Sequence, residues 1–475
     1  MPALLSPPDA VDVLVVGAGP TGLGAAQRLQ ERGADWALVE AEAHAGGLAG
    51  SFIDAAGFTW DYGGHVQHSH YDSFDRAMDA ALAPGDWLVH RRHSSVWVHG
   101  RFVPYPLQHH LHYLDAGDCA RMIEGLRQAA RARTEAPGPP AHFDAWLEAS
   151  FGRPLADLFM RPYNRKVWQY PLDELDYGWI ADRVAVPDVE DLADAIAARR
   201  DRSDWGPNAT FRYPRHGGTG APWRAIAAAL PAERAAFGQR VTGVDLGRRV
   251  VTLTHGRRVR YRSLVTTLPL DVLLRISENP APPRALDPAQ LRFSSIDVVG
   301  VGIEGTPPPD VAERCWMYFP DASSPYFRVT LLSRYSPYNV PSPGDAWSLM
   351  AEVAGRPGES PHPEALRKEV PAALRRDLLL PPDARIVTVA HRHCVRGYPT
   401  PFLGRDNVVE AALAWFETYG VFSRGRFGAW KYEVSNQDHS YAQGREAVDR
   451  ICEQGGRSLE PTLWTPTIVN GRRNA

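Results

Sequence analysis

Cysteine is scarce in this chain, and the few cysteines are far apart. Only four occur in 475 residues, and no two of them form a CxxC pair. This spacing argues against a disulfide framework and against a structural zinc site. We therefore expect a protein of a reducing compartment, the cytoplasm. The four residues are Cys119, Cys315, Cys394 and Cys452.

Long apolar runs and long basic runs are also missing. No stretch approaches the roughly 18 consecutive apolar residues of a membrane span, and the first eight residues lack the basic start and apolar core of a signal peptide. Positive and negative residues are interspersed and give a net charge of −3, without a basic field for nucleic acid. We expect a soluble cytoplasmic protein that binds neither membrane nor nucleic acid.

A dinucleotide-binding fingerprint opens the chain. Residues 12–16 form an apolar run of strand length, followed by Gly17, Gly19 and Gly22 and then by a helical pattern. In this fingerprint the first glycine permits a tight turn, the second lets the backbone approach a pyrophosphate, and the third lets helix and strand pack closely. A second short strand ends in Glu40, where the fingerprint places an acid that binds ribose hydroxyls. The pattern predicts a dinucleotide site.

A second glycine pair, Gly46 and Gly47, follows the acid directly. That extension is typical of two-dinucleotide-type flavoproteins, so we expect the dinucleotide to be FAD, not NAD. The chain is too long for one hydrophobic core and suggests two or three domains.

The apolar periodicity changes along the chain and predicts an α/β protein in three parts. A Rossmann-type FAD-binding domain is expected from the discontinuous segments 1–92, 210–270 and 420–455. Three- and four-residue apolar spacing predicts a helical insertion over 108–205. Strand-like segments predict a mainly antiparallel sheet, the substrate domain, over 93–107 and 271–419, including two short strands around the His99–Gly100 turn.

Seven motifs, in order along the chain, carry a specific resemblance. They resemble the UDP-galactopyranose mutase family, particularly its eukaryotic branch, over about residues 12 to 450. The motifs are Asp61–His65, Phe159–Trp168, Asp204–Arg212, Gly217–Gly220, Arg334–Asn339, Gly397–Pro401 and Arg426–Ser440.

The resemblance implies an FAD-dependent, net redox-neutral interconversion of the pyranose and furanose forms of a nucleotide-linked hexose. In the family, N5 of the reduced flavin attacks the anomeric carbon and displaces the nucleoside diphosphate, so the flavin is a covalent catalyst. NADPH or NADH is the expected reductant. A nucleotide sugar is therefore the expected small-molecule partner, and a homo-oligomer is compatible with the sequence.

The resemblance also assigns residues to the leaving diphosphate. Arg183 and Arg328 match the arginines that clamp the pyrophosphate, a role that suits the permanently charged guanidinium fork. Tyr335, Tyr398 and Tyr432 match tyrosines whose hydroxyls donate to the same oxygens. Without the family, these residues would be read as ion-paired surface arginines and half-buried core tyrosines.

His65 follows two glycines and matches a histidine at the reactive edge of the flavin, where it responds to the redox state; with Arg183 and Arg328 it completes the expected catalytic set. Further residues are matched to flavin or substrate. Those for the flavin are Gly64, Arg426, Asn436 and Gln437, the last two opening an expected final helix, and those for the sugar or nucleotide are Tyr105, Gln108, Asn164, Trp168, Asn208, Tyr318 and Asn436.

Two departures from the family limit the substrate assignment. Leu107 stands where the family usually has Phe, and Arg334 stands where the eukaryotic branch typically has Asn. An aliphatic chain and an added guanidinium suit guanine, so a GDP-hexose such as GDP-galactose is an alternative to UDP-galactose. The other interpretation is that Leu107 is a packing substitution and Arg334 points to solvent.

Two other functions and a metal site are alternative interpretations of this sequence. An FAD-dependent amine oxidase or desaturase shares the glycine-rich start, but its substrate has no phosphate for Arg183 and Arg328. A silent nucleotide-sugar binder is disfavoured by the intact His65 and Asn436. His391–Cys394 lacks further ligands at suitable spacing, so no metal site is expected.

Overall fold

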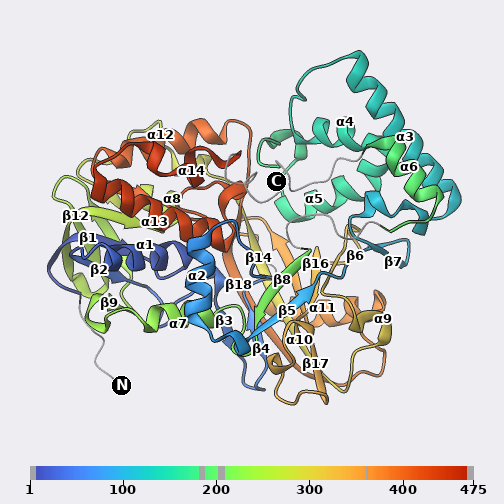
Figure 1. Cartoon of the computed structure of the whole chain (residues 1–475), viewed down its shortest axis with the longest axis horizontal. Helices are drawn as coiled ribbons and strands as arrows, with labels where there is room; N and C mark the ends of the chain where they lie inside the picture. Colours follow the sequence, from blue (N-terminus) through green and yellow to red (C-terminus); the bar gives the residue numbers. More distant parts are fainter. Residues whose placement is uncertain (1–6, 181–187, 202–208, 360–361, 468–475) are drawn as a thin grey trace.

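The computed structural model describes residues 7–180, 188–201, 209–359 and 362–467. Two large sheets and a group of helices make up three regions (Figure 1). The sheets confirm the predicted α/β fold class, with a Rossmann-type part and a mainly antiparallel part.

The first sheet is built around β1 (Ala10–Val16), which pairs in parallel with β2 (Trp36–Val39) and β12 (Arg258–Thr266). β1 and β2 are mainly apolar and mostly buried on both faces, as parallel strands usually are, whereas β12 begins with alternating exposed arginines and is buried on both faces only over 264–266. The remaining strands of the sheet are β9 (Ala235–Ala236), β10 (Val241–Asp245), β11 (Val250–Leu253), β13 (Ser277–Glu278) and β19 (Val421–Ser423).

Helices α1 (Pro20–Glu31) and α13 (Gln437–Glu453) lie side by side against this sheet (Figure 1). Their backbones approach closely, because a Cβ on Gly24 would lie 2.3 Å from the carbonyl oxygen of Tyr441, and one on Gly444 would lie 1.9 Å from that of Thr21. The two ends of the sequence thus meet in one layer, as the expected final helix requires.

The second sheet has seven strands and is antiparallel except between β15 and β6. The predicted turn at His99–Gly100 is present, and both residues adopt positive φ, 51° and 74°. In sheet order the strands are β18 (Ile386–Pro399), β14 (Phe293–Glu304), β17 (Ala346–Gly355), β16 (Arg328–Leu331), β15 (Trp316–Tyr318), β6 (Ser94–Val98) and β7 (Arg101–Pro104).

A lobe of helices stands above the second sheet in Figure 1. Asp188 caps its last helix by accepting hydrogen bonds from the N–H groups of Glu190 and Asp191. The proline-rich segment 136–140 separates the first two helices, as expected. The helices are α3 (Ala116–Glu135), α4 (Phe143–Leu155), α5 (Arg161–Trp168) and α6 (Val189–Ala197).

The packing departs from the predicted domain boundaries at two places. Helices α8 (Leu270–Ile276) and α12 (Arg405–Glu417) share a hydrophobic core with the first sheet, although 271–419 was assigned to the substrate domain. The periodicity could not show this, because an apolar helix face does not say which sheet it covers. The division into domains as a whole stays a prediction.

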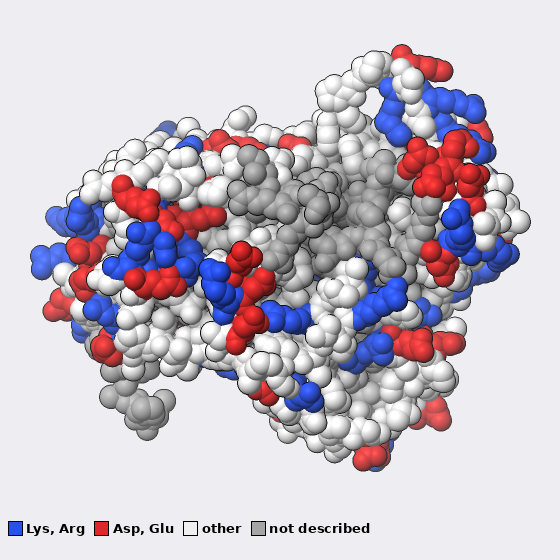
Figure 2. All heavy atoms as spheres, in the orientation of Figure 1, with Lys and Arg blue, Asp and Glu red and all other residues white. Residues whose placement is uncertain are grey.

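Shorter elements connect these parts, and among the described helices none is both long and apolar enough to span a membrane. Figure 2 shows lysine and arginine interspersed with acids on the face it draws. The connecting elements are β3 (Ser51–Ile53), β4 (Thr59–Asp61), α2 (Asp72–Ala81), β5 (Trp87–Arg91), β8 (Thr210–Pro214), α7 (Ala221–Ala228), α9 (Pro309–Ala312), α10 (Leu332–Tyr335), α11 (Pro363–Arg376) and α14 (Pro461–Trp464).

Candidate active site

A cavity of about 670 Å³ is lined by residues of both sheets. On the first sheet its lining lies beyond the carboxyl ends of the parallel strands: Glu40 follows β2, Thr267 follows β12 and Gly425 follows β19. Ligands of open α/β sheets bind at this edge. On the second sheet the lining includes Arg328 and Glu352.

The first turn after β1 needs glycine at two positions for reasons of packing. Gly17 adopts φ of 102°, and a Cβ there would lie 2.0 Å from Oγ1 of Thr267. A Cβ on Gly22 would lie 1.8 Å from the carbonyl oxygen of Gly17. The turn and the close packing of helix on strand therefore match the predicted fingerprint.

At position 19 neither the backbone conformation nor close packing against other protein atoms requires glycine. Its φ is −80°, and a Cβ there would meet no protein atom closer than 3.8 Å. Gly19 lines the cavity and is the N-cap of α1, which has no side-chain cap and no acid in its first turn. The open space and the uncapped N–H groups fit a pyrophosphate that approaches the backbone.

Two further features of the dinucleotide fingerprint lie beside this helix end. Gly46 and Gly47 adopt positive φ, 119° and 52°, and the N–H of Gly46 donates to the carbonyl of Ala18 at 2.9 Å. The Glu40 carboxylate lines the cavity and accepts from the N–H groups of Ala18 and Glu42, at 2.6 and 2.8 Å. Backbone donors thus fix the acid that the fingerprint assigns to a ribose.

His65 lies in the cavity wall between two arginines. Burial, with the nearby charges of Arg426 and Arg328, lowers the pKa of His65 to about 3. Its Nδ1 is buried and has no hydrogen-bond partner among the described residues. His65 is therefore neutral at physiological pH and keeps one ring nitrogen available for a bound group. Gly64 beside it leaves room for Arg328, whose Cζ would lie 3.3 Å from a Cβ there.

Arg426 is a partly buried cation without a carboxylate partner among the described residues. It donates to the carbonyl of Gly397 at 3.1 Å and to Oγ of Ser435 at 3.0 Å, and its guanidinium lies 4.9 Å from the ring centre of Tyr398. Burial lowers the pKa of Arg426. A partly buried positive charge without an acidic partner suits an anionic ligand such as reduced flavin.

Helix α13 presents its N-terminus to the same region. Asn436 is the N-cap residue and makes no side-chain cap, and both Asn436 and Gln437 line the cavity. Gln437 is held by Trp223 and Gln67, which donate to its Oε1 at 2.7 and 3.0 Å. Together with the glycine turns and Arg426, this end of the cavity fits FAD.

The other end of the cavity carries an arginine that is paired with an acid. Arg328 and Glu352 face each other in the β16–β17 ladder, and the guanidinium contacts both carboxylate oxygens. Burial lowers and the Glu352 carboxylate raises the pKa of Arg328, and the net shift is strongly upward. The pair fixes the orientation of a permanently charged fork in the cavity wall.

Tyrosine side chains line the same cavity as this arginine. Tyr105, Tyr318, Tyr398 and Tyr432 all line the cavity. Burial raises the pKa of Tyr398 to about 12, and that of Tyr105 rises further, so their hydroxyls stay protonated. Protonated hydroxyls next to a guanidinium are hydrogen-bond donors for phosphate oxygens.

Several expected substrate residues do not line the cavity. Asn164 and Trp168 bond to each other within α5, from the indole N–H to Oδ1 at 3.2 Å. Tyr335 is fully buried among aromatic rings, and its hydroxyl has no partner among the described residues. Arg183 and Asn208 lie outside the described residues, so their roles stay predictions.

The residues proposed to read the base are also outside the lining. Leu107 is fully buried in the hydrophobic core, with Gln108 buried next to it. Arg334 is exposed and donates to the carbonyl of Ala312 at 3.2 Å. This placement favours the interpretation that Leu107 is a packing substitution and that Arg334 points to solvent. The base preference stays a prediction.

Sequence reasoning missed two acids of the cavity wall. Glu352 was detectable as the one acid inside the apolar run of β17, where it is 2% exposed. The Asp438 carboxylate accepts a hydrogen bond from the backbone N–H of His70 at 2.9 Å and lies 2.7 Å from Nδ1 of the same histidine. It also lies 3.1 Å from Nδ1 of His439. No spacing rule joins residue 70 to residue 438, so this cluster had no signal in the sequence.

Comparison with known proteins places the chain in a family. Residues 20–408 match the family of flavin containing amine oxidoreductases. The crystal structure of a reduced UDP-galactopyranose mutase is 42% identical, with a TM-score of 0.92, over 97% of this chain and 99% of that one.

Two oxidases share the fold at low identity. A putative protoporphyrinogen oxidase from Exiguobacterium sp. 255-15 is 14% identical with a TM-score of 0.70, and cyclohexylamine oxidase from Brevibacterium oxydans IH-35A is 17% identical with a TM-score of 0.64. Each covers 94% of this chain and 99% of its own. The expected family is thus confirmed: the chain belongs to the UDP-galactopyranose mutases, FAD-dependent isomerases within the flavin containing amine oxidoreductases.

Proposed function

We propose that this protein interconverts the pyranose and furanose forms of a nucleotide-linked hexose, with FAD bound in its reduced state. One observation carries the proposal: the glycine turns for a dinucleotide and the Arg328 fork with its tyrosine hydroxyls line the same cavity. A flavin and a sugar diphosphate could therefore meet in one enclosed site.

Reduced FAD, when bound, would supply N5 as the nucleophile for displacement of the nucleoside diphosphate from the anomeric carbon. The residues of the chain hold the charges that this chemistry produces. Arg328, with Tyr398 and Tyr432, binds the diphosphate while it leaves and keeps it in place for its return. Arg426 balances the negative charge of the reduced flavin.

His65 acts at the flavin edge as a neutral hydrogen-bonding group. Because its pKa is about 3, it carries no positive charge at pH 7 and does not serve as a general acid there. Its buried Nδ1 can accept or donate one hydrogen bond, depending on the tautomer, and so can follow the protonation of a reduced cofactor.

The substrate and the reductant are open within this proposal. UDP-galactose and a GDP-hexose are the two candidate substrates, and NADPH or NADH is the proposed source of electrons. Arg183, Asn164, Trp168 and Asn208 are proposed to complete the substrate site, and the cytoplasm is the proposed location.

The competing function is an amine oxidase or desaturase reaction, because such oxidases share the fold. Such an enzyme oxidises its substrate and has no need for a diphosphate site. The buried Arg328 fork among protonated tyrosines favours the mutase.

Incubation with UDP- and GDP-hexoses, followed by chromatographic separation of pyranose from furanose, tests the proposal. The enzyme reduced by dithionite or NADPH under nitrogen should convert at least one substrate with no net consumption of reductant. The oxidised enzyme in air should convert none. Equal turnover in both states would refute the role of reduced flavin, and consumption of oxygen with an amine would favour the oxidase.

A further inference from the structure

Lys166 makes an unusual set of contacts outside the cavity. Its ammonium nitrogen lies within hydrogen-bonding distance of four backbone carbonyl oxygens, those of Phe319, Asp321 and Ser324 at 2.8 Å and that of Tyr326 at 2.7 Å, so its three N–H groups are shared among four acceptors. No carboxylate forms an ion pair with it among the described residues. Four carbonyl oxygens around one cation form a cage, which we call the Lys166 cage.

The cage closes the hairpin that carries the substrate fork. The four carbonyls belong to the loop between β15 and β16, two on each side of it. Tyr318 and Arg328 are paired directly at the base of this loop, and the N–H of Phe319 donates to the carbonyl of Phe327. A shift of the two ends of this loop would therefore change the position of Arg328.

A second set of hydrogen bonds holds the β15–β16 loop through its side chains. Asp377, at the end of α11, accepts from Oγ of Ser324 at 2.6 Å and from the hydroxyl of Tyr326 at 2.5 Å. Without Lys166 the loop keeps this second set of hydrogen bonds and its aromatic contacts with Tyr163 but loses its hydrogen bonds to the helical lobe.

Helix α5 carries Lys166 and two aromatic residues that contact tyrosines of the cavity wall. Besides Lys166 it carries Tyr163, whose ring lies 5.4 Å from that of Tyr318, and Trp168, whose ring lies 5.0 Å from that of Tyr432. Two tyrosines of the cavity wall thus pack against the helix that Lys166 ties to the hairpin.

The cage requires the charged form of the lysine. An ammonium has three N–H donors and no lone pair, whereas a neutral amine would direct its lone pair at a carbonyl oxygen. Burial lowers the pKa of Lys166 to about 7, and Asp321 and Asp377 oppose the fall. The carbonyl dipoles act in the same direction as these carboxylates, because they stabilise the cation.

We propose that Lys166 is a positioning residue, a built-in cation that holds the β15–β16 hairpin against α5 and so sets the position of Arg328 in the diphosphate site. Its effect on ligand binding rests on the proposed function, whereas its effect on the hairpin does not.

Replacement by a smaller residue and rescue by free cations test the cage. Lys166→Ala leaves four carbonyls at a spacing that suits K⁺ or NH₄⁺, ions that backbone carbonyls coordinate, and that is too wide for Mg²⁺ at about 2.1 Å. In tetramethylammonium chloride we expect a lower Tm and about tenfold weaker binding of UDP, read by tryptophan fluorescence. Equal concentrations of KCl or NH₄Cl should restore both.

Two controls separate the cage from general effects. Lys166→Met fills the space without a charge, so its losses should not respond to K⁺ or NH₄⁺, and it serves if the alanine variant does not fold. Lys368→Ala, on the exposed face of α11, should match the wild type in every salt.

The outcomes distinguish this inference from the proposed function. Wild-type Tm and UDP affinity in both Lys166 variants, or losses in Lys166→Ala that no cation reverses, would overturn the cage. If the cations restore Tm while even the wild type binds no UDP, the cage stands and the diphosphate site is wrong.

Discussion

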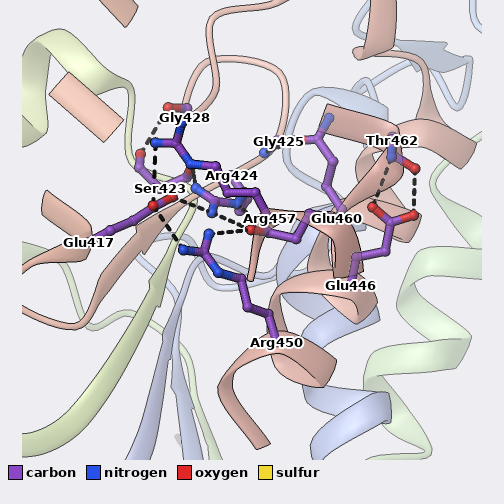
Figure 3. Close-up of polar contacts among 11 residues, drawn as sticks. Glu417, Ser423, Arg424, Gly425, Gly428, Glu446, Arg450, Arg457, Glu460 and Thr462 are labelled. Carbon is purple, nitrogen blue, oxygen red and sulfur yellow. Dashed lines mark hydrogen bonds and ion pairs between the residues drawn. The ribbon is translucent and has the colours of Figure 1, made fainter. Parts of the chain in front are cut away.

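Arg424 and Arg426 are two residues apart, and their surroundings are opposite. Arg424 is completely buried and contacts two acids, Glu460 at 2.5 and 2.8 Å and Glu417 at 2.8 Å (Figure 3). Arg450 bridges the same two acids. Arg426 faces the cavity and bonds only to a carbonyl and a serine among the described residues.

The difference separates a structural arginine from a functional one. The charge of Arg424 is neutralised by carboxylates from α12 and the start of α14, so it holds the C-terminal helices together. The charge of Arg426 has no such partner and is available to an anionic ligand. Arg328 lies between the two cases, because its one acid, Glu352, leaves its fork at the cavity wall.

The largest expected effect is that of Arg424→Met on stability. The substitution leaves Glu417 and Glu460 buried with only Arg450 and the partly exposed Arg457 to balance them. Breaking a buried pair from one side costs about 3–5 kcal/mol of unfolding free energy. Urea denaturation followed by circular dichroism measures the loss.

The control for Arg424→Met is Arg32→Ala, which removes an exposed arginine paired with Asp449 and Glu453. Because surface ion pairs contribute little, its denaturation curve should match the wild type. If Arg424→Met were as stable as Arg32→Ala, the ion-pair cluster would not hold the C-terminal helices.

Arg328→Ala should weaken substrate binding, and it should also lower stability because it leaves the buried Glu352 carboxylate unpaired. The variant loses charged hydrogen bonds to the diphosphate, which is worth about 2–5 kcal/mol of binding free energy where these bonds are desolvated. Isothermal titration with UDP measures the loss, and the flavin spectrum should remain, because the proposed FAD site is at the other end of the cavity.

A second variant separates the fork from the buried acid it leaves behind. Adding Glu352→Gln to Arg328→Ala removes the unpaired carboxylate and should restore thermal stability without restoring UDP affinity. Wild-type UDP affinity in either variant would contradict the diphosphate assignment.

Glu446 should make stability depend on pH. Burial raises the pKa of Glu446 to about 8, although Thr462 donates to its carboxylate from N–H at 3.1 Å and from Oγ1 at 2.7 Å (Figure 3). The folded state therefore holds a proton that the unfolded state releases near pH 4.5, so the free energy of unfolding falls as pH rises from about 4.5 to 8.

Glu446→Gln should keep the contacts and remove this dependence. We expect equal stability of variant and wild type at pH 5 and a variant more stable by about 3–4 kcal/mol at pH 8, from urea denaturation at both values. Parallel pH profiles would show that Glu446 is ionised in the folded protein.

Arg426→Gln should change the flavin potential while stability changes little. Removing the cation disfavours the anionic reduced flavin, so the two-electron midpoint potential should fall by about 30 mV, which equals roughly tenfold in relative affinity. Potentiometric titration against a reference dye measures the shift, with Arg424→Met as the comparison where it folds. An unchanged potential would place the Arg426 charge away from the flavin.

The glycine fingerprint and many of the strands of both sheets could be predicted from the sequence, because each rests on local rules, whereas β18, β15 and β19 were not predicted. Gly17 and Gly22 follow from turn geometry, and β14 and β17 follow from apolar runs. The His70–Asp438 contact and the assignment of α8 and α12 to the first sheet depend on how distant segments pack.

Matching a family motif also did not show which side chains reach the cavity. Tyr398 and Tyr432 line it, whereas Tyr335, matched by the same reasoning, is enclosed by Phe211 and Tyr213. An aligned position fixes the backbone, but the direction and surroundings of the side chain depend on its neighbours.

The smallest expected effect concerns the base. Leu107 is in the hydrophobic core and Arg334 bonds to a surface carbonyl, so neither lines the wall of the cavity. By contrast, Arg92 lies 5.5 Å from the ring centre of Tyr105, and both residues line the cavity next to Trp316. If base contact is made there, Leu107→Phe and Arg334→Asn should change the ratio of UDP to GDP affinity by no more than about twofold, less than 0.5 kcal/mol.

Competition of UDP against GDP on the reduced enzyme measures the ratio in the wild type and in both variants. A tenfold shift toward UDP in either variant would instead show that a residue outside the cavity lining selects guanine. A wild type that prefers GDP would favour a GDP-hexose as the substrate, independently of Leu107 and Arg334.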